Sequence, residues 1–189
     1  MTELSRSFYR GNTVAVARSL IGASFARRYR GAWYLARIVE TEAYLGSNDA
    51  AAHSRGGRRT ARVEPMYADG GHLYVFLVYG MHHCANVVTR RPGMPEAVLI
   101  RAGEGPPEAP PALLSGPGRF CAALGITAAA TGMDIVDGSD YRLYRRDRRP
   151  RIGVSPRIGV DYAAEAKDWP LRFYDRDSRA VSGRPRLRR

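Results

Sequence analysis

Lysine is nearly absent from this sequence. Lys167 is the single lysine among 30 basic residues, and all the others are arginine. Chemistry that needs a lysine amine, such as Schiff-base formation, must therefore use Lys167 or is excluded. Cysteine is also scarce, since Cys84 and Cys121 share no CxxC spacing and are the only two. This argues against a disulfide framework and a cysteine-ligated zinc site, and it favours a reducing compartment.

Long hydrophobic runs are missing as well. No segment is apolar over the length that spans a bilayer, and the N-terminus has neither an apolar core nor a cleavage signal for export. We therefore expect a cytoplasmic protein. The 189 residues, 44% of them hydrophobic, are enough for one globular domain over residues 1–189, with a mobile tail from about residue 183.

Acidic residues are outnumbered, with 18 Asp and Glu against 30 Lys and Arg, for a formal net charge of +12. Residues 142–189 hold 14 of the arginines and the one lysine against six acids, so the C-terminal quarter accounts for most of the excess. A protein this basic is expected to bind a polyanion. Nucleic acid is the first candidate, and an anionic membrane surface is the second.

Hydrophobic periodicity and turn residues predict a mixed α and β fold. A helix is expected over residues 14–21, with Asn12 or Thr13 as its N-cap. The other expected elements are a strand over 33–44, a polar loop over 51–65, a hairpin over 72–90 that turns near 79–81, a strand over 97–102, a proline-rich irregular stretch over 103–114 and a helix that begins near residue 119.

Two carboxylates, Glu40 and Glu42, lie two residues apart inside an otherwise apolar strand. Alternation predicts that they share one face and that Val39 and Thr41 share the other. Like charges so close repel unless a cation pairs with them or one stays protonated. Arg101 is a plausible counter-charge, and an arginine on the surface is the commoner alternative. A buried carboxylate is what a general base acting on water requires. The alternative for Glu40 is a solvated position at the strand edge.

The four histidines do not have the spacing of a metal site. His82 and His83 are neighbours on an expected strand, where consecutive side chains point to opposite faces, so they cannot both reach one ion. We therefore expect no metal. His53, in the polar loop, is a flat ring suited to stacking on a ligand, although a loop histidine satisfied by its neighbours is the commoner case.

Aromatic side chains and a glycine-rich turn are the remaining candidates for binding. Base stacking on aromatic rings stabilises nucleic-acid complexes by about 1–3 kcal/mol per base, and core packing is the alternative role. The aromatic residues in question are Trp33, Tyr44, Tyr74, Phe76 and Tyr79. Ser115 to Gly118, followed by Arg119, is a turn that either offers backbone N–H groups to a phosphate or simply caps a helix.

Five segments, in this order and spacing, resemble the alkyladenine (3-methyladenine) DNA glycosylases, with bacterial members the closer match. They are RIVETEAYLGSNDAAAHSRGGRRT, LYVFLVYGMHHCANV, VLIRAGE, LLSGPGRF and RIGVDYAAEAKDWPLRFY. The likeness extends from about Ser19 to Ser182. It implies a single α/β (α+β) domain with a curved, largely antiparallel sheet, surrounding helices and a protruding β-hairpin that inserts into DNA.

The resemblance also implies an activity. Members of this family flip an alkylated or deaminated purine out of duplex DNA and hydrolyse its N-glycosidic bond with an activated water, which starts base excision repair. The implied partner is double-stranded DNA containing damaged purines, with no cofactor, no metal and no membrane. A monomer is expected, because one hairpin in one groove needs no symmetry partner. The only lysine, Lys167, lies in the last of the five segments, and the segments that hold Glu42 and Arg101 contain none. Water is therefore the natural nucleophile, so we expect a monofunctional enzyme.

Individual roles follow from the matching positions. Glu42 would be the base, with Arg101 and the main-chain carbonyl of Val160 holding the water. The residues implied to contact the flipped base are Tyr44, His53, Phe76 and Asn86, with Asn86 crowding the 2-amino group of undamaged guanine. Tyr79 would wedge into the base stack. The implied phosphate contacts are Gly80, Met81, Ser115, Gly118 and Arg119.

Some positions depart from the vertebrate pattern. Phe76 stands in place of tyrosine, which keeps the π-face and loses the hydroxyl, and Asp161 stands in place of glycine. His82 and His83 flank the expected wedge and could donate to a phosphate or a base edge. Which lesion is preferred among 3-methyladenine, 7-methylguanine, hypoxanthine and ethenoadenine depends on the dimensions of the pocket.

Two functions from other classes compete with the glycosylase. A basic nucleic-acid-binding protein without catalysis would explain the charge and the aromatic residues, but not Glu42 opposite Arg101 in an apolar strand. A metal-dependent nuclease would use Glu40 and Glu42, but the sequence lacks the lysine and the further acidic cluster that such a site needs. Release of a free base from an alkylated duplex in EDTA distinguishes all three.

Overall fold

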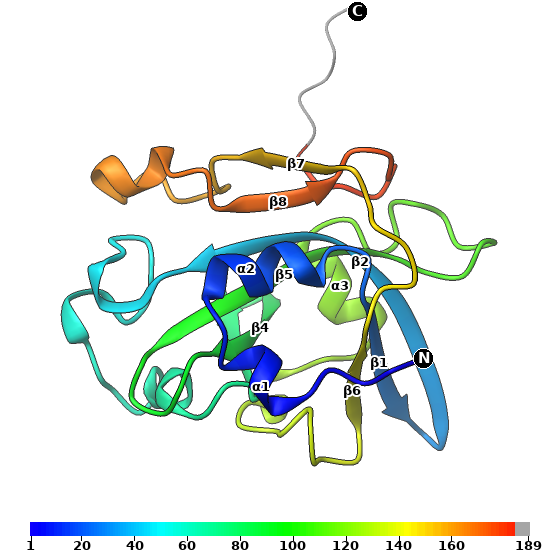
Figure 1. Cartoon of the computed structure of the whole chain (residues 1–189), viewed down its shortest axis with the longest axis horizontal. Helices are drawn as coiled ribbons and strands as arrows, with labels where there is room; N and C mark the ends of the chain where they lie inside the picture. Colours follow the sequence, from blue (N-terminus) through cyan, green and yellow to red (C-terminus); the bar gives the residue numbers. More distant parts are fainter. Residues whose placement is uncertain (184–189) are drawn as a thin grey trace, which may run out of the picture.

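One antiparallel sheet organises the chain. The computed structural model describes residues 1–183, so the tail predicted to be mobile from about residue 183 falls almost entirely outside the described residues. The strands are β1 Ser24–Tyr29, β2 Ala32–Tyr44, β3 Leu73–Val78, β4 His82–Thr89, β5 Glu96–Glu104, β6 Tyr141–Tyr144, β7 Ile152–Ser155 and β8 Arg172–Asp175. Their order is β3-β4-β5-β2-β1-β6, and β8 joins β2 to β7. The expectation of a curled antiparallel sheet is confirmed (Figure 1).

The long strand β2 is the centre of the sheet because it has three partners. Its first half pairs with β1, and its second half lies between β5 on one side and β8 on the other. Glu42 is therefore opposite Leu99 of β5 and also opposite Arg172 of β8. A residue with a strand on both sides has no edge to solvent, so this topology buries the acidic half of β2.

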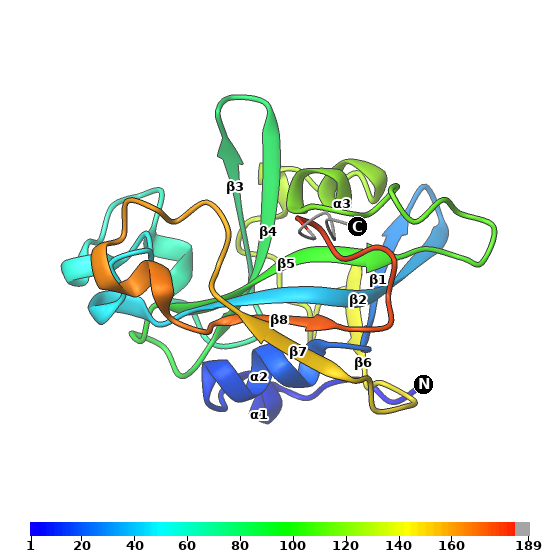
Figure 2. The ribbon, with the colours of Figure 1, turned by 90° about the horizontal axis from the view of Figure 1, so that it is seen from above.

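The helices are few and short. They are α1 Arg6–Tyr9, α2 Thr13–Leu20 and α3 Pro117–Ala123, with short 3-10 turns η1 Gly46–Asn48, η2 Arg55–Gly57, η3 Glu64–Tyr67, η4 Ala128–Ala130 and η5 Ala164–Asp168. Of the two predicted caps, Asn12 is the one used, and its side chain accepts a hydrogen bond from the amide of Ala15 at 3.1 Å. Figure 2 shows α2 and α3 on opposite sides of β5.

The predicted hairpin is confirmed. Strands β3 and β4 pair from Leu73 to Val78, and the amide of Met81 donates to the carbonyl of Val78 at 3.1 Å to close the turn. Tyr79 and Gly80 have φ values of 51° and 69°, the left-handed pair that matches the twist of a tight hairpin. The hairpin rises well beyond the rest of the sheet (Figure 2), and the Tyr79 side chain at its tip is 88% exposed.

Of the predicted faces of β2, the shared side of Glu40 and Glu42 agrees with the structure, since Arg101 contacts both, whereas the placement of Val39 with Thr41 does not. The pairing of β2 with β5 shifts register between Ile38 and Glu40 and again between Glu40 and Thr41. Such β-bulges interrupt the alternation of side chains. Val39 packs with Ala180 and Val181, next to the Ser182 that bonds to Glu40, whereas the Thr41 hydroxyl bonds to the carbonyl of Ala17 in α2. Two smaller differences are that β5 extends to Glu104 and that α3 begins at Pro117.

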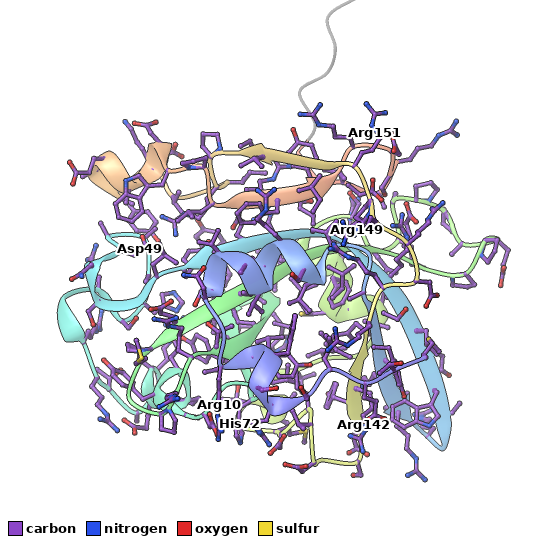
Figure 3. All side chains as sticks on the ribbon, viewed as in Figure 1. Arg10, Asp49, His72, Arg142, Arg149 and Arg151 are labelled. Carbon is purple, nitrogen blue, oxygen red and sulfur yellow. The ribbon has the colours of Figure 1, made fainter. Side chains whose placement is uncertain are left out.

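The arginines are spread over several sides of the molecule. Figure 3 labels Arg10 and Arg142 along the lower edge and Arg151 at the upper edge, and each is paired with a carboxylate. Surface pairs of this kind contribute little to stability. Among residues 1–183, no helix has both the length and the apolar character needed to cross a membrane.

Candidate active site

The two strand carboxylates are both fully buried. Glu40 and Glu42 are each 0% exposed, so the alternative of a solvated Glu40 is wrong. The physical reason is that β8 and the C-terminal residues cover the side of β2 that would otherwise be an edge. Arg101, from the neighbouring strand β5, contacts both carboxylates and is the counter-charge expected from the sequence.

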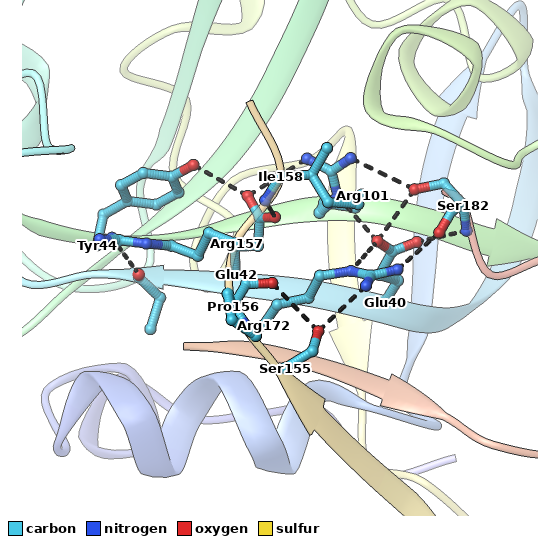
Figure 4. Close-up of polar contacts among 11 residues, drawn as sticks. Glu40, Glu42, Tyr44, Arg101, Ser155, Pro156, Arg157, Ile158, Arg172 and Ser182 are labelled. Atoms are coloured by element: carbon cyan, nitrogen blue, oxygen red, sulfur yellow. Dashed lines mark hydrogen bonds and ion pairs between the residues drawn. The ribbon is translucent and has the colours of Figure 1, made fainter. Parts of the chain in front are cut away.

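Three donors hold the Glu42 carboxylate (Figure 4). The backbone amide of Ile158 donates to Oε1 at 2.8 Å, and the Tyr44 hydroxyl donates to Oε2 at 2.9 Å. Nη1 of Arg101 reaches the same Oε2 at a longer 3.3 Å. Burial raises the pKa of Glu42, and Arg101, the Ile158 amide and Tyr44 oppose that rise. The result is a fixed carboxylate that is more basic than an ordinary glutamate.

Glu40 is held even more completely. Its Oε1 accepts from Nε of Arg101 at 2.9 Å and from Nε of Arg172 at 2.7 Å. The amide of Ser182 donates to Oε2 at 2.7 Å, and the Ser182 hydroxyl donates to Oε1 at 3.0 Å. Two arginines and two acids thus form a compact buried cluster, which offsets the cost of burying each charge alone.

A cavity of about 510 Å³ opens beside this cluster. Its wall includes eight of the residues singled out from the sequence: Tyr44, His53, Tyr74, Phe76, Tyr79, Asn86, Arg101 and Val160. Glu42 lies directly behind the wall, because three wall residues, Tyr44, Arg101 and Ile158, are its hydrogen-bond donors. The fold therefore brings residues that are more than a hundred positions apart in the sequence to the wall of one cavity.

Aromatic rings define one side of the cavity. The rings of His53 and Phe76 meet edge to face with centroids 4.5 Å apart, and Nδ1 of His53 is 2.8 Å from the Tyr74 hydroxyl. Burial, with the nearby charges of Arg62 and Arg58, lowers the pKa of His53, which favours the neutral ring. A neutral, hydrogen-bonded imidazole keeps a fixed orientation and offers its face for stacking.

The polar wall of the cavity is equally fixed. The amide nitrogen of Asn86 donates to the carbonyls of Tyr74 at 3.0 Å and Cys84 at 3.3 Å, so both of its hydrogens are used within the protein. The Val160 carbonyl accepts from the amide of Ala163 at 2.9 Å and retains a second lone pair. Within residues 1–183, no group of three or more His, Cys, Asp or Glu side chains is placed to hold a metal ion.

The predicted phosphate contacts do not line the cavity and lie around the hairpin instead. Gly80 and Met81 are at the tip, where Met81 is 71% exposed. Gly118 is packed against the hairpin next to its tip, since a Cβ there would be 3.1 Å from Cβ of His82, the first residue after the turn. Ser115 forms a bridge to Ala102, and Arg119 is exposed. Helix α3, which contains Gly118 and Arg119, packs against β4 of the hairpin, and the five residues do not form a single concave site.

Sequence reasoning missed several residues of the site. Arg172 sits in the apolar strand LRFY, the same signal that drew attention to Arg101, and could have been found. Ser182 gave no such signal. Arg157 and Asp49 form an ion pair with side chains 0% exposed, and the Arg157 guanidinium lies 4.8 Å from the centroid of the Tyr44 ring. Both residues come from polar loops, which normally indicate solvated positions.

Comparison with known proteins agrees with this architecture. The model of the methylpurine-DNA glycosylase family matches residues 7–179. Relatives include proteins of Desulfitobacterium hafniense (45% identical, covering 96% of this chain and 99% of the relative), Methanocella arvoryzae (44%, 97% and 98%) and Bdellovibrio bacteriovorus (43%, 95% and 98%), each provisionally named a 3-methyladenine DNA glycosylase. The chain is thus similar to DNA glycosylases, enzymes that hydrolyse N-glycosyl bonds. It belongs to the methylpurine-DNA glycosylase family.

Proposed function

We propose that this protein is a monofunctional DNA glycosylase that flips alkylated or deaminated purines out of duplex DNA and hydrolyses the N-glycosidic bond, which initiates base excision repair. The observation that supports this most strongly is Glu42, a buried carboxylate with a raised pKa, placed directly behind an aromatic cavity. A base inside a duplex is unreachable, so an enzyme acting on it needs a pocket and a means of extrusion.

The proposed chemistry uses Glu42 as a general base. As the bond between C1′ and the purine nitrogen breaks, positive charge develops on the sugar, and the anionic carboxylate stabilises it. The oxygen of a water molecule attacks C1′, Glu42 takes one of its protons, and the purine leaves with the bonding electron pair. Arg101 and the Val160 carbonyl would hold this water, since both border the cavity next to Glu42.

Base recognition is assigned to the walls of the cavity. Tyr44, His53 and Phe76 would sandwich the extruded purine, and the fixed amide of Asn86 would crowd an undamaged guanine at its 2-amino group. Support comes from the shared cavity and from the hydrogen bonds that fix the orientation of His53 and Asn86. A rigid pocket selects by shape, because its groups do not move to accommodate a wrong base.

Extrusion is assigned to Tyr79. The side chain is the most exposed large hydrophobic residue described, it stands at the end of a protruding hairpin, and it also lines the cavity. An aromatic ring in that position can fill the gap left by a flipped nucleotide. The phosphates flanking the gap would meet Gly80 and Met81 at the tip, and Ser115, Gly118 and Arg119 beside it. One hairpin in one groove requires one copy, so the protein would act as a monomer.

Base release in the presence of EDTA tests this function against its competitors. Purified protein is incubated with a duplex containing 3-methyladenine, 7-methylguanine, hypoxanthine or ethenoadenine, and both free base and strand length are measured. The glycosylase releases base and leaves an intact abasic strand, whatever the lesion preferred. A binding protein releases nothing, and a metal-dependent nuclease needs the metal and shortens the strand; either result would refute the proposal.

A further inference from the structure

The C-terminal segment, residues 180–182, reaches the buried cluster from just beyond the residues that the family model matches. That match ends at residue 179, and Ser182 makes four polar contacts within the cluster. Besides its two bonds to Glu40, its hydroxyl oxygen is 3.4 Å from Nη2 of Arg101 and its carbonyl accepts from Nη2 of Arg172 at 2.6 Å. Ser182 is 9% exposed, and the adjacent Ala180 and Val181 pack on Val39.

These contacts determine where the Arg101 guanidinium points. Its Nε is bonded to Glu40 and its Nη2 approaches Ser182, so the remaining Nη1 is directed at Glu42. A guanidinium is a planar, rigid fork, and fixing two of its nitrogens fixes the third. Glu40 itself is kept in place by Arg172 and by both donors of Ser182.

We propose that Ser182, acting through Glu40, is a positioning residue that directs Arg101 toward Glu42, so that the C-terminal segment is a working part of the active site (Figure 4). This rests on the proposed function, in which Glu42 is the base. Ser182 does not line the cavity and would not touch the substrate. Its effect on base release would therefore come through the geometry of Arg101.

The same cluster determines the electrostatic environment of the Glu42 carboxylate. The groups that face Glu42 are Arg101 from β5, Glu40 and Tyr44 from β2, the Ile158 amide from the loop after β7 and, at longer range, Arg157, Cys84 and Tyr162. Glu40 is the like charge among them, and it shares Arg101 with Glu42. Replacing Glu40 by glutamine removes that negative charge, so that Glu42 becomes the only carboxylate paired with Arg101. Protonation of Glu42 then becomes harder, and the acidic limb of activity moves to lower pH.

The test compares Ser182→Ala with Ser182→Thr, which retains the hydroxyl. The control is Ser139→Ala, the same substitution at an exposed serine outside the cluster. Single-turnover base release is measured in EDTA at saturating protein, together with melting temperature and DNA affinity. We expect Ser182→Ala to lose about tenfold in rate with unchanged affinity, as for loss of a hydrogen bond to a charged group. Ser182→Thr and Ser139→Ala should retain the wild-type rate. Glu40→Gln should shift the acidic limb to lower pH, with a smaller loss of rate than Glu42→Gln.

Two results would overturn the inference. One is wild-type single-turnover kinetics in Ser182→Ala, whatever the pH profile of Glu40→Gln. The other is an equal loss in Ser182→Ala and Ser182→Thr that follows their melting temperatures, since this would indicate a role in folding alone. If the wild-type protein itself releases no base, the proposed function fails first, and this inference fails with it.

Discussion

The substitution Tyr79→Ala tests whether this side chain inserts into the DNA base stack or packs within the protein. Tyr79 is 88% exposed at the hairpin tip, so its side chain has little packing to lose. We therefore expect the free energy of unfolding to change by no more than about 0.5 kcal/mol, as for surface substitutions in general. A buried aromatic residue such as Phe25 would instead lose about 3–5 kcal/mol on truncation.

The effect on activity should depend on how firmly the target base is paired. Extruding a paired base costs a few kcal/mol, and an aromatic ring that stacks in its place offsets about 2 kcal/mol of that cost. Removing the ring should therefore slow base release about thirtyfold for hypoxanthine that is well paired. For hypoxanthine in a mismatch or in a single strand the loss should be much smaller, because less pairing and stacking has to be broken.

The assay measures single-turnover rates on these substrates alongside thermal unfolding. Tyr34→Ala is the matched control, since Tyr34 is a tyrosine 49% exposed on β2 that does not line the cavity. Tyr34→Ala should leave all rates unchanged. An equal loss on paired, mismatched and single-stranded substrates, or a large fall in melting temperature, would show that Tyr79 is a packing residue.

Three further predictions follow from charges in the structure. Burial raises the pKa of Glu42, and Glu42 must be anionic to act as the base. Base release should therefore fall as the pH drops through a pKa above that of an ordinary glutamate. An acidic limb at or below the ordinary pKa, in a single-turnover pH series, would contradict this. DNA binding should weaken with salt, with a log–log slope of about −0.9 per phosphate neutralised, and a flat titration would argue against a duplex substrate. Arg157→Met should lower the free energy of unfolding by about 3–5 kcal/mol in denaturant titrations, because it leaves the buried Asp49 carboxylate without its cation. The control Arg151→Met, which breaks an exposed ion pair, should change it by less than about 1 kcal/mol. Equal effects of the two substitutions would refute the reasoning.

Local signals in the sequence were enough to predict the elements that frame the site. The hairpin was predictable because β-rich runs converge on Tyr79, Gly80 and Met81, and the cap of α2 because Asn12 directly precedes an amphipathic stretch. Arg101 was a candidate for a similar reason, since an arginine in an apolar strand suggests a buried partner, although a surface position is the commoner one for an arginine. Each of these inferences uses residues close together in the chain.

Burial of Glu40 was not predictable in the same way. It depends on β8, which pairs with β2 from more than a hundred residues further along, and on bulges whose positions have no sequence signature here. Two of the four contacts of Ser182 use its backbone amide and carbonyl, and Ile158 acts through its amide alone, so the identity of these side chains gives little clue to their place in the cluster. Long-range pairing and main-chain contacts are the parts that required the structure.

The substitution Glu42→Gln tests the central claim most directly. It preserves the shape of the side chain, removes the anion that would activate water and stabilise the sugar cation, and removes a charge that opposes the DNA phosphates. Single-turnover base release and affinity for lesion-containing duplex are measured on the same preparation, in EDTA. We predict that base release is abolished while DNA binding is retained or becomes tighter. Base release within tenfold of the wild-type rate would contradict the assignment of Glu42 as the catalytic base.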